Sequence, residues 1–330
     1  MKLQNRLKLL QQLADYLNKN DTNWGETILK AQQFNAWFIP EFVQLAVHNI
    51  HNNFLQPQIL QQWIQHYHID DNTGGKNVGI VMAGNIPLVG FHDFLCVFLA
   101  GHQCSIKLSS KDEVLMQHII SLLHQWAPEL QQQIVVAPML KGCDAYIATG
   151  SNNSARYFDY YFGQYPSIIR RNRTSVAVLS GNESPEELDR LSDDIHLYFG
   201  LGCRNVTKLY VPRGYDFVPL LNSFNRYQYF LEHHKYKNNY DYCLSIQIMN
   251  NRFYMTNGST LLLENAPVFT PVSQVHYEYF TDAETLQETL KADQNIQCIV
   301  GAGVPFGAAQ SPGIMDYADG VDTMQFLLGL

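Results

Sequence analysis

The fold class is decided in residues 78–108, which read VGIVMAGNIPLVGFHDFLCVFLAGHQCSIKL. Two short apolar runs, residues 78–83 and 104–108, flank an apolar segment at residues 88–100 that is long enough for a helix. A strand, a helix and a second strand in this order are typical of a βαβ unit, in which the two strands are parallel. The sequence therefore predicts an α/β protein with a mostly parallel sheet.

The same alternation continues toward the C-terminus. We expect a helix at residues 111–126, strands at residues 134–137, 145–149 and 175–179, and a helix that follows Ser151. Five strands with crossover connections favour a nucleotide-binding domain, which we assign to residues 78–179. The fold class alone does not identify an activity, because such sheets host many chemistries.

Residues 1–77 form a helical N-terminal segment in our interpretation, because apolar residues recur there every three or four positions. Pro40 and Pro57 fall where new helices would begin, in the first turn, where proline is tolerated. The polar residues 70–76, with Gly74 and Gly75, predict a linker or tight loop before the first strand.

A second α/β domain is expected from about residue 180 to residue 300. Its first helix should begin after Ser184, because the run Ser184-Pro185-Glu186-Glu187 has the capping-box arrangement, and should end at Gly200 or Gly202. Further strands are expected at residues 206–211, 244–249, 260–263 and 298–300, with a helix at residues 283–291. Residues 301–330 are expected to return between the domains and dock.

The composition excludes several classes of protein. The 330 residues include 46% hydrophobic and 16% charged side chains, which is too apolar for a disordered chain. The net charge is −8, whereas proteins that bind nucleic acid or anionic lipid need a basic stripe or clustered Lys and Arg, so the composition does not favour either class. No apolar run approaches the ~20 residues of a membrane span, and the N-terminus lacks a signal-peptide pattern, so we expect a cytoplasmic protein. Six scattered cysteines without a Cys-x-x-Cys pair predict neither a disulfide scaffold nor a metal site.

The first candidate for chemistry is Cys203, in the run YFGLGCRNVTKLYV at residues 198–211. It sits in a turn with two glycines between a helix and a strand, from which a thiol can project into a cleft. Alternatively, it packs as a small hydrophobic residue, as most free cysteines do. The C-terminus of the preceding helix disfavours a thiolate, so any lowering of the pKa of Cys203 must come from elsewhere, and Arg204 and a cofactor are the candidates.

The second candidate is Asn85, which follows the first parallel strand and precedes a helix, the place where ligands bind in open α/β sheets. Its amide could hold a developing oxyanion. The alternative is an asparagine turn that caps the following helix.

His196 lies seven residues before Cys203, two turns back on the same helix face. It could act as an acid or base if the end of the helix bends toward a cleft. The alternative is a buried or surface histidine without a chemical role.

The motifs together resemble the aldehyde dehydrogenase superfamily, and more closely its acyl-CoA reductase branch, the LuxC family. The ordered set is Asn85-Ile86-Pro87, residues 106–112, Thr149-Gly150-Ser151, Gly202-Cys203 and Pro305-Phe306-Gly307. The resemblance covers about residues 78–330. It implies an aldehyde-dehydrogenase-like fold with a Rossmann-type nucleotide-binding domain and an α/β catalytic domain.

The resemblance also implies roles for individual residues. Cys203 becomes the nucleophile, and Asn85 with the backbone N–H of Cys203 becomes the oxyanion site. His196 stays a secondary catalytic candidate.

The cofactor implied by the resemblance is NADPH or NADH. Lys107, with Ser109 beside it, would contact the adenosine ribose or its phosphate, although Lys107 could equally be a solvated strand end. Gly150 and Ser151 would face the pyrophosphate, which the N–H groups of a helix N-terminus favour. Phe306 would also contact the cofactor.

One departure from the family pattern concerns the general base. Ordinary aldehyde dehydrogenases carry a glutamate in a segment that here reads RRNRTS, residues 170–175. Without this base, hydrolysis of an enzyme thioester should be slow, while exchange with an outside thiol remains open. Arg170, Arg171 and Arg173 either meet phosphates of CoA or form a solvated, salt-bridged surface.

These features predict NAD(P)H-dependent reduction of an acyl thioester, from acyl-CoA or acyl carrier protein, to an aldehyde through a cysteine acyl-enzyme. Two alternatives remain: a CoA-acylating aldehyde dehydrogenase working in the oxidative direction, and a catalytically silent binding or scaffold subunit. Full-length members of the superfamily that the chain resembles are longer, so we expect the chain to lack much of their N-terminal and oligomerisation material, and an oligomer is left open.

Overall fold

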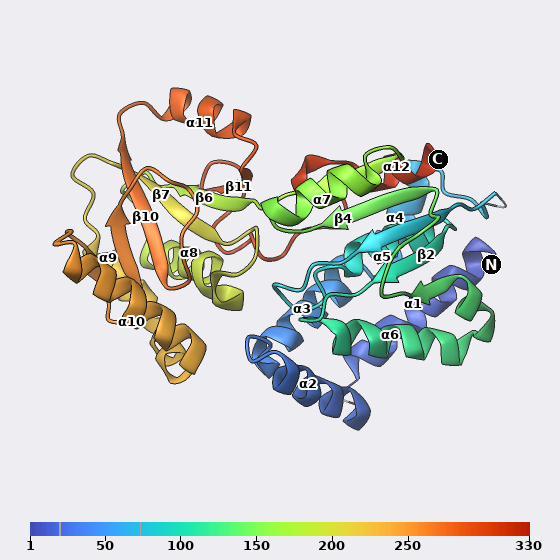
Figure 1. The fold of residues 1–330 in the computed structure, drawn as a ribbon. Helices are drawn as coiled ribbons and strands as arrows, with labels where there is room; N and C mark the ends of the chain where they lie inside the picture. The colour runs from blue at the N-terminus through green and yellow to red at the C-terminus, as the bar shows by residue number, and fades with distance from the viewer. Residues whose placement is uncertain (20, 73) are drawn as a thin grey trace. The chain divides into compact units, whose positions relative to one another are not determined.

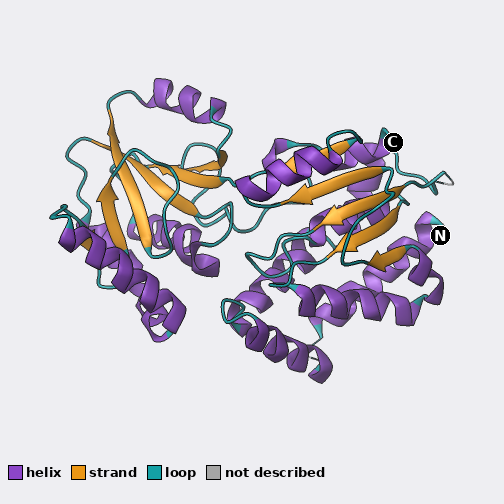
Figure 2. Cartoon of the chain, viewed as in Figure 1, coloured by secondary structure: helices purple, strands orange, loops and turns teal. Residues whose placement is uncertain are grey.

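A computed structural model describes residues 1–19, 21–72 and 74–330. The chain divides into two compact units (Figure 1). Unit 1 comprises Met1–Asn172 together with Pro312–Leu330, and unit 2 comprises Arg173–Ser311. In each unit helices flank a sheet (Figure 2), so the predicted α/β class is confirmed. The division falls between Asn172 and Arg173, a few residues before the predicted boundary at residue 179.

Unit 1 contains a five-stranded sheet in the order β3-β2-β1-β4-β5, and the pairings between its strands are all parallel. Its strands are β1 (Asn77–Val81), β2 (Gln103–Lys107), β3 (Ile134–Val136), β4 (Ala145–Thr149) and β5 (Ser167–Arg170). The prediction of residues 175–179 as the fifth strand of this sheet was wrong, because they pair with strands of unit 2. The true fifth strand has only two central apolar residues, Ile168 and Ile169, and gives a weak sequence signal.

Crossover helices connect these strands: α5 (Phe91–Leu99), α6 (Glu113–Trp126) and α7 (Asn152–Phe162). Helix α7 lies on one face of the sheet and α6 on the other (Figure 1). Helix α5 is buried at every position except His92, which explains its nearly continuous apolar sequence.

The N-terminal helices complete the core of unit 1. They are α1 (Leu3–Asn18), α2 (Thr22–Phe34), α3 (Pro40–Asn53) and α4 (Pro57–Tyr67), and their apolar faces join one hydrophobic cluster with α5 and α6. Both predicted proline starts are confirmed. The described residues of the 70–76 segment are irregular, and residue 73 lies outside the described residues. The last helix, α12 (Thr323–Leu328), packs against α5.

Unit 2 contains a six-stranded sheet in the order β11-β6-β7-β10-β9-β8, parallel except for the β8–β9 pair. The strands are β6 (Thr174–Val178), β7 (Val206–Pro212), β8 (Met255–Thr256), β9 (Leu261–Glu264), β10 (Gln274–Phe280) and β11 (Ile296–Val300). The helices are α8 (Pro185–His196), α9 (Val218–Ser223), α10 (His234–Met249) and α11 (Ala283–Ala292). The predicted capping box at Ser184 and Glu187 is present in full.

The predicted strand at residues 244–249 was wrong, because these residues form the last part of α10. The helix buries Tyr236, Tyr240, Cys243 and Gln247, at spacings of four, three and four. The apolar residues Ile248 and Met249, which suggested a strand, lie on its exposed surface. The helical signal was carried by tyrosines and was missed.

Arg170 is buried in an ion pair, with Nη1 2.5 Å from Asp93 Oδ2 on α5. Its Nη2 also donates to the Thr323 hydroxyl at 2.8 Å, so the pair ties together β5, α5 and the start of α12. The Arg170 guanidinium is 4% exposed and is bound to Asp93 and Thr323, so it cannot contact a phosphate of CoA. The prediction that Arg170 contacts CoA was therefore wrong. Arg171, by contrast, forms an exposed pair with Asp159.

Among the described residues, no helix combines the length and the apolar character needed to cross a lipid bilayer.

We expect Asp93→Ala to destabilise unit 1 by about 3–5 kcal/mol, because it leaves the buried Arg170 without its carboxylate. Arg171→Ala is the matched control and should cost less than about 1 kcal/mol, since its ion pair is exposed. Urea unfolding followed by tryptophan fluorescence measures this directly, because all four tryptophans lie in unit 1. Equal effects of the two substitutions would contradict the assignment.

Candidate functional site

Four of the predicted site residues of unit 1 lie at one edge of its sheet. Val81, the last residue of β1, is paired with Lys107 of β2, and the strand register aligns it with Ala148 of β4 on the other side. The carboxyl ends of these three strands therefore meet at the same edge. Lys107 and Ser109 follow from β2, and Gly150 and Ser151 follow from β4. Asn85 follows from β1, so a fifth predicted residue joins the same edge.

This edge is also the topological switch point of the sheet. The chain leaves β1 toward β2 on one side, and β4 is added on the other side of β1. Ligands of open α/β sheets bind at such points, outside the carboxyl ends of the strands. Asn85, Lys107 and Ser151 are exposed there.

Two loops at this edge pack tightly against each other. A Cβ on Gly84 would lie 2.5 Å from Ser109 Oγ and 3.1 Å from the backbone nitrogen of Asp112. Only glycine permits this approach, so the Asn85 loop rests directly on the turn that follows β2.

Helix α7 begins at the same edge. Ser151 is its N-cap, and its hydroxyl accepts the backbone N–H of Ser154 at 3.3 Å. The remaining N–H groups of the first turn and the Lys107 ammonium group together make a donor set suited to the phosphates of a dinucleotide.

Cys203 of unit 2 lies in the turn between α8 and β7 and is half-buried. The chain leaves α8 through a short 3-10 turn, Leu197–Gly200, in which Tyr198 and Phe199 have φ of 56° and 57°. Gly200 continues with φ of 73°. Bulky residues rarely adopt this left-handed conformation, so surrounding contacts must hold the turn.

Asn205 supplies these contacts, and the sequence reasoning missed it. Its buried side-chain amide donates to the carbonyls at the end of α8, those of Asp194, Ile195 and Leu197, at 2.9–3.2 Å. Its side-chain oxygen accepts the N–H of Gly202 at 2.8 Å. One side chain thus caps the helix and closes the turn around Cys203.

Ser175 of β6 holds the turn from the sheet. Its hydroxyl donates to the carbonyl of Cys203 at 3.1 Å and accepts the backbone N–H of Cys298 at 3.2 Å. The thiol of Cys298 lies 3.0 Å from the same oxygen. Either atom can be the donor in this contact, because the hydroxyl and the thiol each carry one proton.

Cys298 is a second half-buried thiol near the Cys203 turn, which the sequence did not single out. Burial raises the pKa of Cys298, while hydrogen bonds with Ser175 and Arg204 and the charge of Arg204 oppose this rise. Arg204, considered above as an activator of Cys203, therefore acts on Cys298. No disulfide involves any of the described cysteines.

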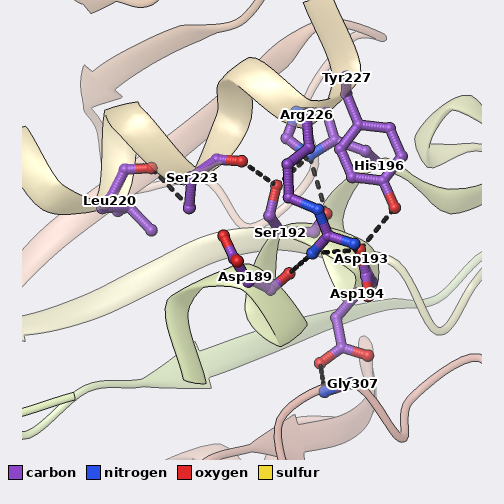
Figure 3. Close-up of polar contacts among 10 residues, drawn as sticks. All are labelled: Asp189, Ser192, Asp193, Asp194, His196, Leu220, Ser223, Arg226, Tyr227 and Gly307. Atoms are coloured by element: carbon purple, nitrogen blue, oxygen red, sulfur yellow. Dashed lines mark hydrogen bonds and ion pairs between the residues drawn. The ribbon is translucent and has the colours of Figure 1, made fainter. Parts of the chain in front are cut away.

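His196 lies in the interior of unit 2 (Figure 3). Its Nδ1 is 2.8 Å from the Ser192 carbonyl, its Nε2 is 3.0 Å from the Thr260 hydroxyl, and its ring stacks on Tyr227. Burial lowers the pKa of His196 to about 4, so the ring is neutral at pH 7. This geometry is that of a packed histidine, the alternative that the sequence left open.

A small cavity of about 20 Å³ adjoins His196, Phe199 and Thr270. It has room for one water molecule but not for an acyl chain.

Phe306 lies in unit 2, partly buried against its core. The segment that carries it is fixed by Asp194, whose carboxylate accepts the N–H of Gly307 at 2.6 Å (Figure 3). The same carboxylate accepts the N–H of Ala309 at 2.9 Å. Burial raises the pKa of Asp194 to about 6. Contact of Phe306 with a cofactor stays a prediction.

No protein-family model and no curated protein sequence matches the chain. Solved structures of aldehyde dehydrogenases do match. Aldehyde dehydrogenase 21 from Physcomitrella patens, in complex with the reaction product succinate, has a TM-score of 0.68 at 13% identity, over 92% of this chain and 74% of that one. An NAD-dependent aldehyde dehydrogenase from Sinorhizobium meliloti gives 0.66 at 10%, over 91% and 70%.

An acetylating aldehyde dehydrogenase from Geobacillus thermoglucosidasius gives a TM-score of 0.63 at 11% identity, and the match covers 99% of this chain and 90% of that one. These similarities show that the chain has the fold of the aldehyde dehydrogenases. At such low identities they show the fold alone.

We expect Asp194 and His196 to give unit 2 opposite dependences on pH. The pKa of His196, about 4 in the fold against an ordinary value of 6.5, gives stability that is lost as the pH falls from 6.5 toward 4. The pKa of Asp194, about 6 against 3.8, makes the folded state bind a proton in the range 6 to 3.8, so stability rises as the pH falls there.

In Asp194→Asn only the effect of His196 remains, so stability should fall more steeply below pH 6 than in wild type. In His196→Phe only the effect of Asp194 remains, so stability should rise as the pH falls below 6. Differential scanning calorimetry at a series of pH values measures the stability of both variants. It is needed because unit 2 contains no tryptophan and its unfolding does not change tryptophan fluorescence. Parallel pH profiles for wild type and the two variants would contradict these assignments.

We expect Arg204→Gln to slow the alkylation of Cys298 by iodoacetamide about three- to tenfold at pH 8, because the variant raises the pKa of this thiol. Peptide mass spectrometry over a time course gives the rate for each cysteine separately. Arg226→Gln, which removes a cation paired with Asp193, is the control and should leave the rate unchanged. An unchanged rate in Arg204→Gln would show that Arg204 does not act on Cys298.

Proposed function

We propose that this protein reduces an acyl thioester, from acyl-CoA or acyl carrier protein, to an aldehyde with NADPH or NADH. The observation that carries the proposal is the Cys203 turn. A half-buried thiol stands in a strained loop that Asn205 and Ser175 fix on both sides, within a chain that has the aldehyde dehydrogenase fold. A turn held this firmly suits a nucleophile that must meet a carbonyl in one orientation.

The edge of the unit 1 sheet supports binding of a nicotinamide dinucleotide. Lys107 and Ser109 would hold the adenosine ribose or its phosphate, and Gly150 with Ser151 at the start of α7 would hold the pyrophosphate. The donor set fits, because a cation and exposed helix N–H groups face one edge at the switch point. When bound, the cofactor supplies the hydride that reduces the acyl group.

In the proposed reaction the Cys203 thiolate attacks the thioester carbonyl, forming a new C–S bond. The thiolate of CoA or of the carrier protein leaves, and an acyl-enzyme on Cys203 remains. The amide of Asn85 and the backbone N–H of Cys203 are the proposed donors to the oxyanion. After reduction the thiohemiacetal on Cys203 breaks its C–S bond, releases the aldehyde and restores the thiol.

The segment at residues 170–175 supports transfer to a thiol over hydrolysis. Arg170 is buried in its ion pair, and Thr174 and Ser175 are buried in β6. This segment therefore offers no carboxylate that could activate water in the way the glutamate of ordinary aldehyde dehydrogenases does. We give His196 a packing role, since both its ring nitrogens are engaged in the interior.

A second candidate is a CoA-acylating aldehyde dehydrogenase that works in the oxidative direction. The extensive overlap with an acetylating aldehyde dehydrogenase favours it, because that match spans nearly all of both chains. The same thiol and the same hydride carrier serve either direction, so kinetics with both substrate pairs separates them. In both cases we place the reaction in the cytoplasm.

Incubation with acyl-CoA and no nicotinamide cofactor should place one acyl group on Cys203. Intact-protein and peptide mass spectrometry measure the mass gain and its position. Cys203→Ala should lose both the adduct and aldehyde formation, whereas Cys298→Ser, the matched control, should keep the adduct on Cys203. Turnover that survives in Cys203→Ala, or an adduct on Cys298 alone, would refute the proposal, and a protein without either activity would be a scaffold.

A further inference from the structure

Leu88 is held in a backbone conformation that its side chain disfavours. It lies in the loop from β1 to α5, three residues after Asn85, with φ of 57°. Its carbonyl accepts the N–H of Phe91 at 2.9 Å, its N–H donates to Asp112 Oδ2 at 2.6 Å, and its side chain is 3% exposed. Such a conformation persists in a bulky residue only where several contacts fix it together.

The side chain of Asp112 has an unusual hydrogen-bond partner. It occupies the N-cap position of α6, where an aspartate normally accepts an N–H of its own helix, yet it makes no cap bond. It accepts instead from Leu88, 24 residues earlier. Helix α6 therefore has no side-chain cap, and the carboxyl group that could supply it anchors the loop beside Asn85 instead.

The burial of Asp112 shows what this anchor costs. The residue is 4% exposed, none of the ion pairs found among the described residues includes it, and its Oδ1 has no hydrogen-bond partner in the described chain. Burial raises the pKa of this carboxyl well above its usual range, against the effect of the Leu88 N–H. An alanine would avoid this cost but could not hold Leu88.

The turn around Asp112 also touches the other side of Asn85. Gly84, the residue immediately before Asn85, packs so closely on Ser109 and on the Asp112 nitrogen that a Cβ there would clash. The Asp112 N–H itself donates to the Ser109 carbonyl at 3.0 Å. Asn85 is therefore flanked by Gly84 and Leu88, and both are fixed by one turn.

We propose that Asp112 is a positioning residue for Asn85, acting through the N–H of Leu88 to hold the loop that presents the oxyanion-binding amide. This inference rests on the proposed function of Asn85. Asp112 does not touch the substrate, so its loss should lower the rate of the chemical step and leave substrate affinity nearly unchanged.

The test compares Asn85→Ala, Asp112→Ala, Asp112→Asn and the double variant N85A/D112A in aldehyde formation from acyl-CoA and NADPH. Asn85→Ala should lower kcat about 100-fold. Asp112→Ala should lower kcat about tenfold or more, with KM for acyl-CoA within about threefold. Asp112→Asn should stay within about threefold of wild type, since its amide oxygen still accepts the Leu88 N–H.

The double variant distinguishes positioning from general structural support. If Asp112 acts through Asn85, N85A/D112A should be within about threefold of Asn85→Ala, because the two losses are not independent. Additive losses, or an unchanged kcat in Asp112→Ala, would overturn the inference. An unchanged kcat in Asn85→Ala would instead refute the proposed oxyanion role, so the two failures are distinguishable.

A second readout does not depend on turnover. Hydrogen exchange of peptides covering residues 83–90 should become faster in Asp112→Ala and stay as in wild type in Asp112→Asn. Glu113→Ala, at the exposed neighbouring position on α6, is the control and should change neither exchange nor kcat. Unchanged exchange in Asp112→Ala would overturn the inference even if no aldehyde forms.

Discussion

The candidate catalytic turn depends on one side chain, that of Asn205. Three carbonyls at the end of α8 and the N–H of Gly202 are all satisfied by its amide, in a place that water does not reach. Each buried polar group left without a partner would cost about 1–3 kcal/mol. Its backbone carbonyl also accepts the N–H of Ser175, so the same residue joins the turn to the sheet. These bonds fix the backbone of the turn that carries Cys203.

Two buried carboxylates organise the βαβ unit of unit 1 in different ways. Asp93 is neutralised by Arg170, and their pair fastens α5 to β5 and α12. Asp112 has only the N–H of Leu88 as a side-chain partner among the described residues, and it holds a loop at the candidate cofactor edge. The Asp93–Arg170 pair stabilises the scaffold. The burial of Asp112 instead lowers stability at the candidate cofactor edge, and strain is commonly found at such functional positions.

The sequence predicted the features that local rules govern. Parallel-sheet geometry placed Asn85, Lys107 and Ser151 at one edge, and capping rules placed the start of α8 correctly. It failed where the signal was weak or long-range. Strand β5 has only two central apolar residues, and the buried face of α10 consists largely of tyrosines, so its helical periodicity is not visible in the pattern of aliphatic residues. Ser175 and Cys298, 123 residues apart, meet only through the pairing of β6 with β11, which no local pattern reveals.

The proposed chemistry requires transfer of a hydride from the nicotinamide cofactor to an acyl group on Cys203, and a single turnover tests this step most directly. Protein acylated on Cys203 and freed of excess acyl-CoA is mixed with NADPH, and the nicotinamide absorbance and the products are followed. One NADPH should be oxidised for each acyl group, with release of one aldehyde and return of the free thiol. An acyl group that persists on Cys203 with NADPH unchanged, or that leaves as the carboxylic acid, would contradict the proposal.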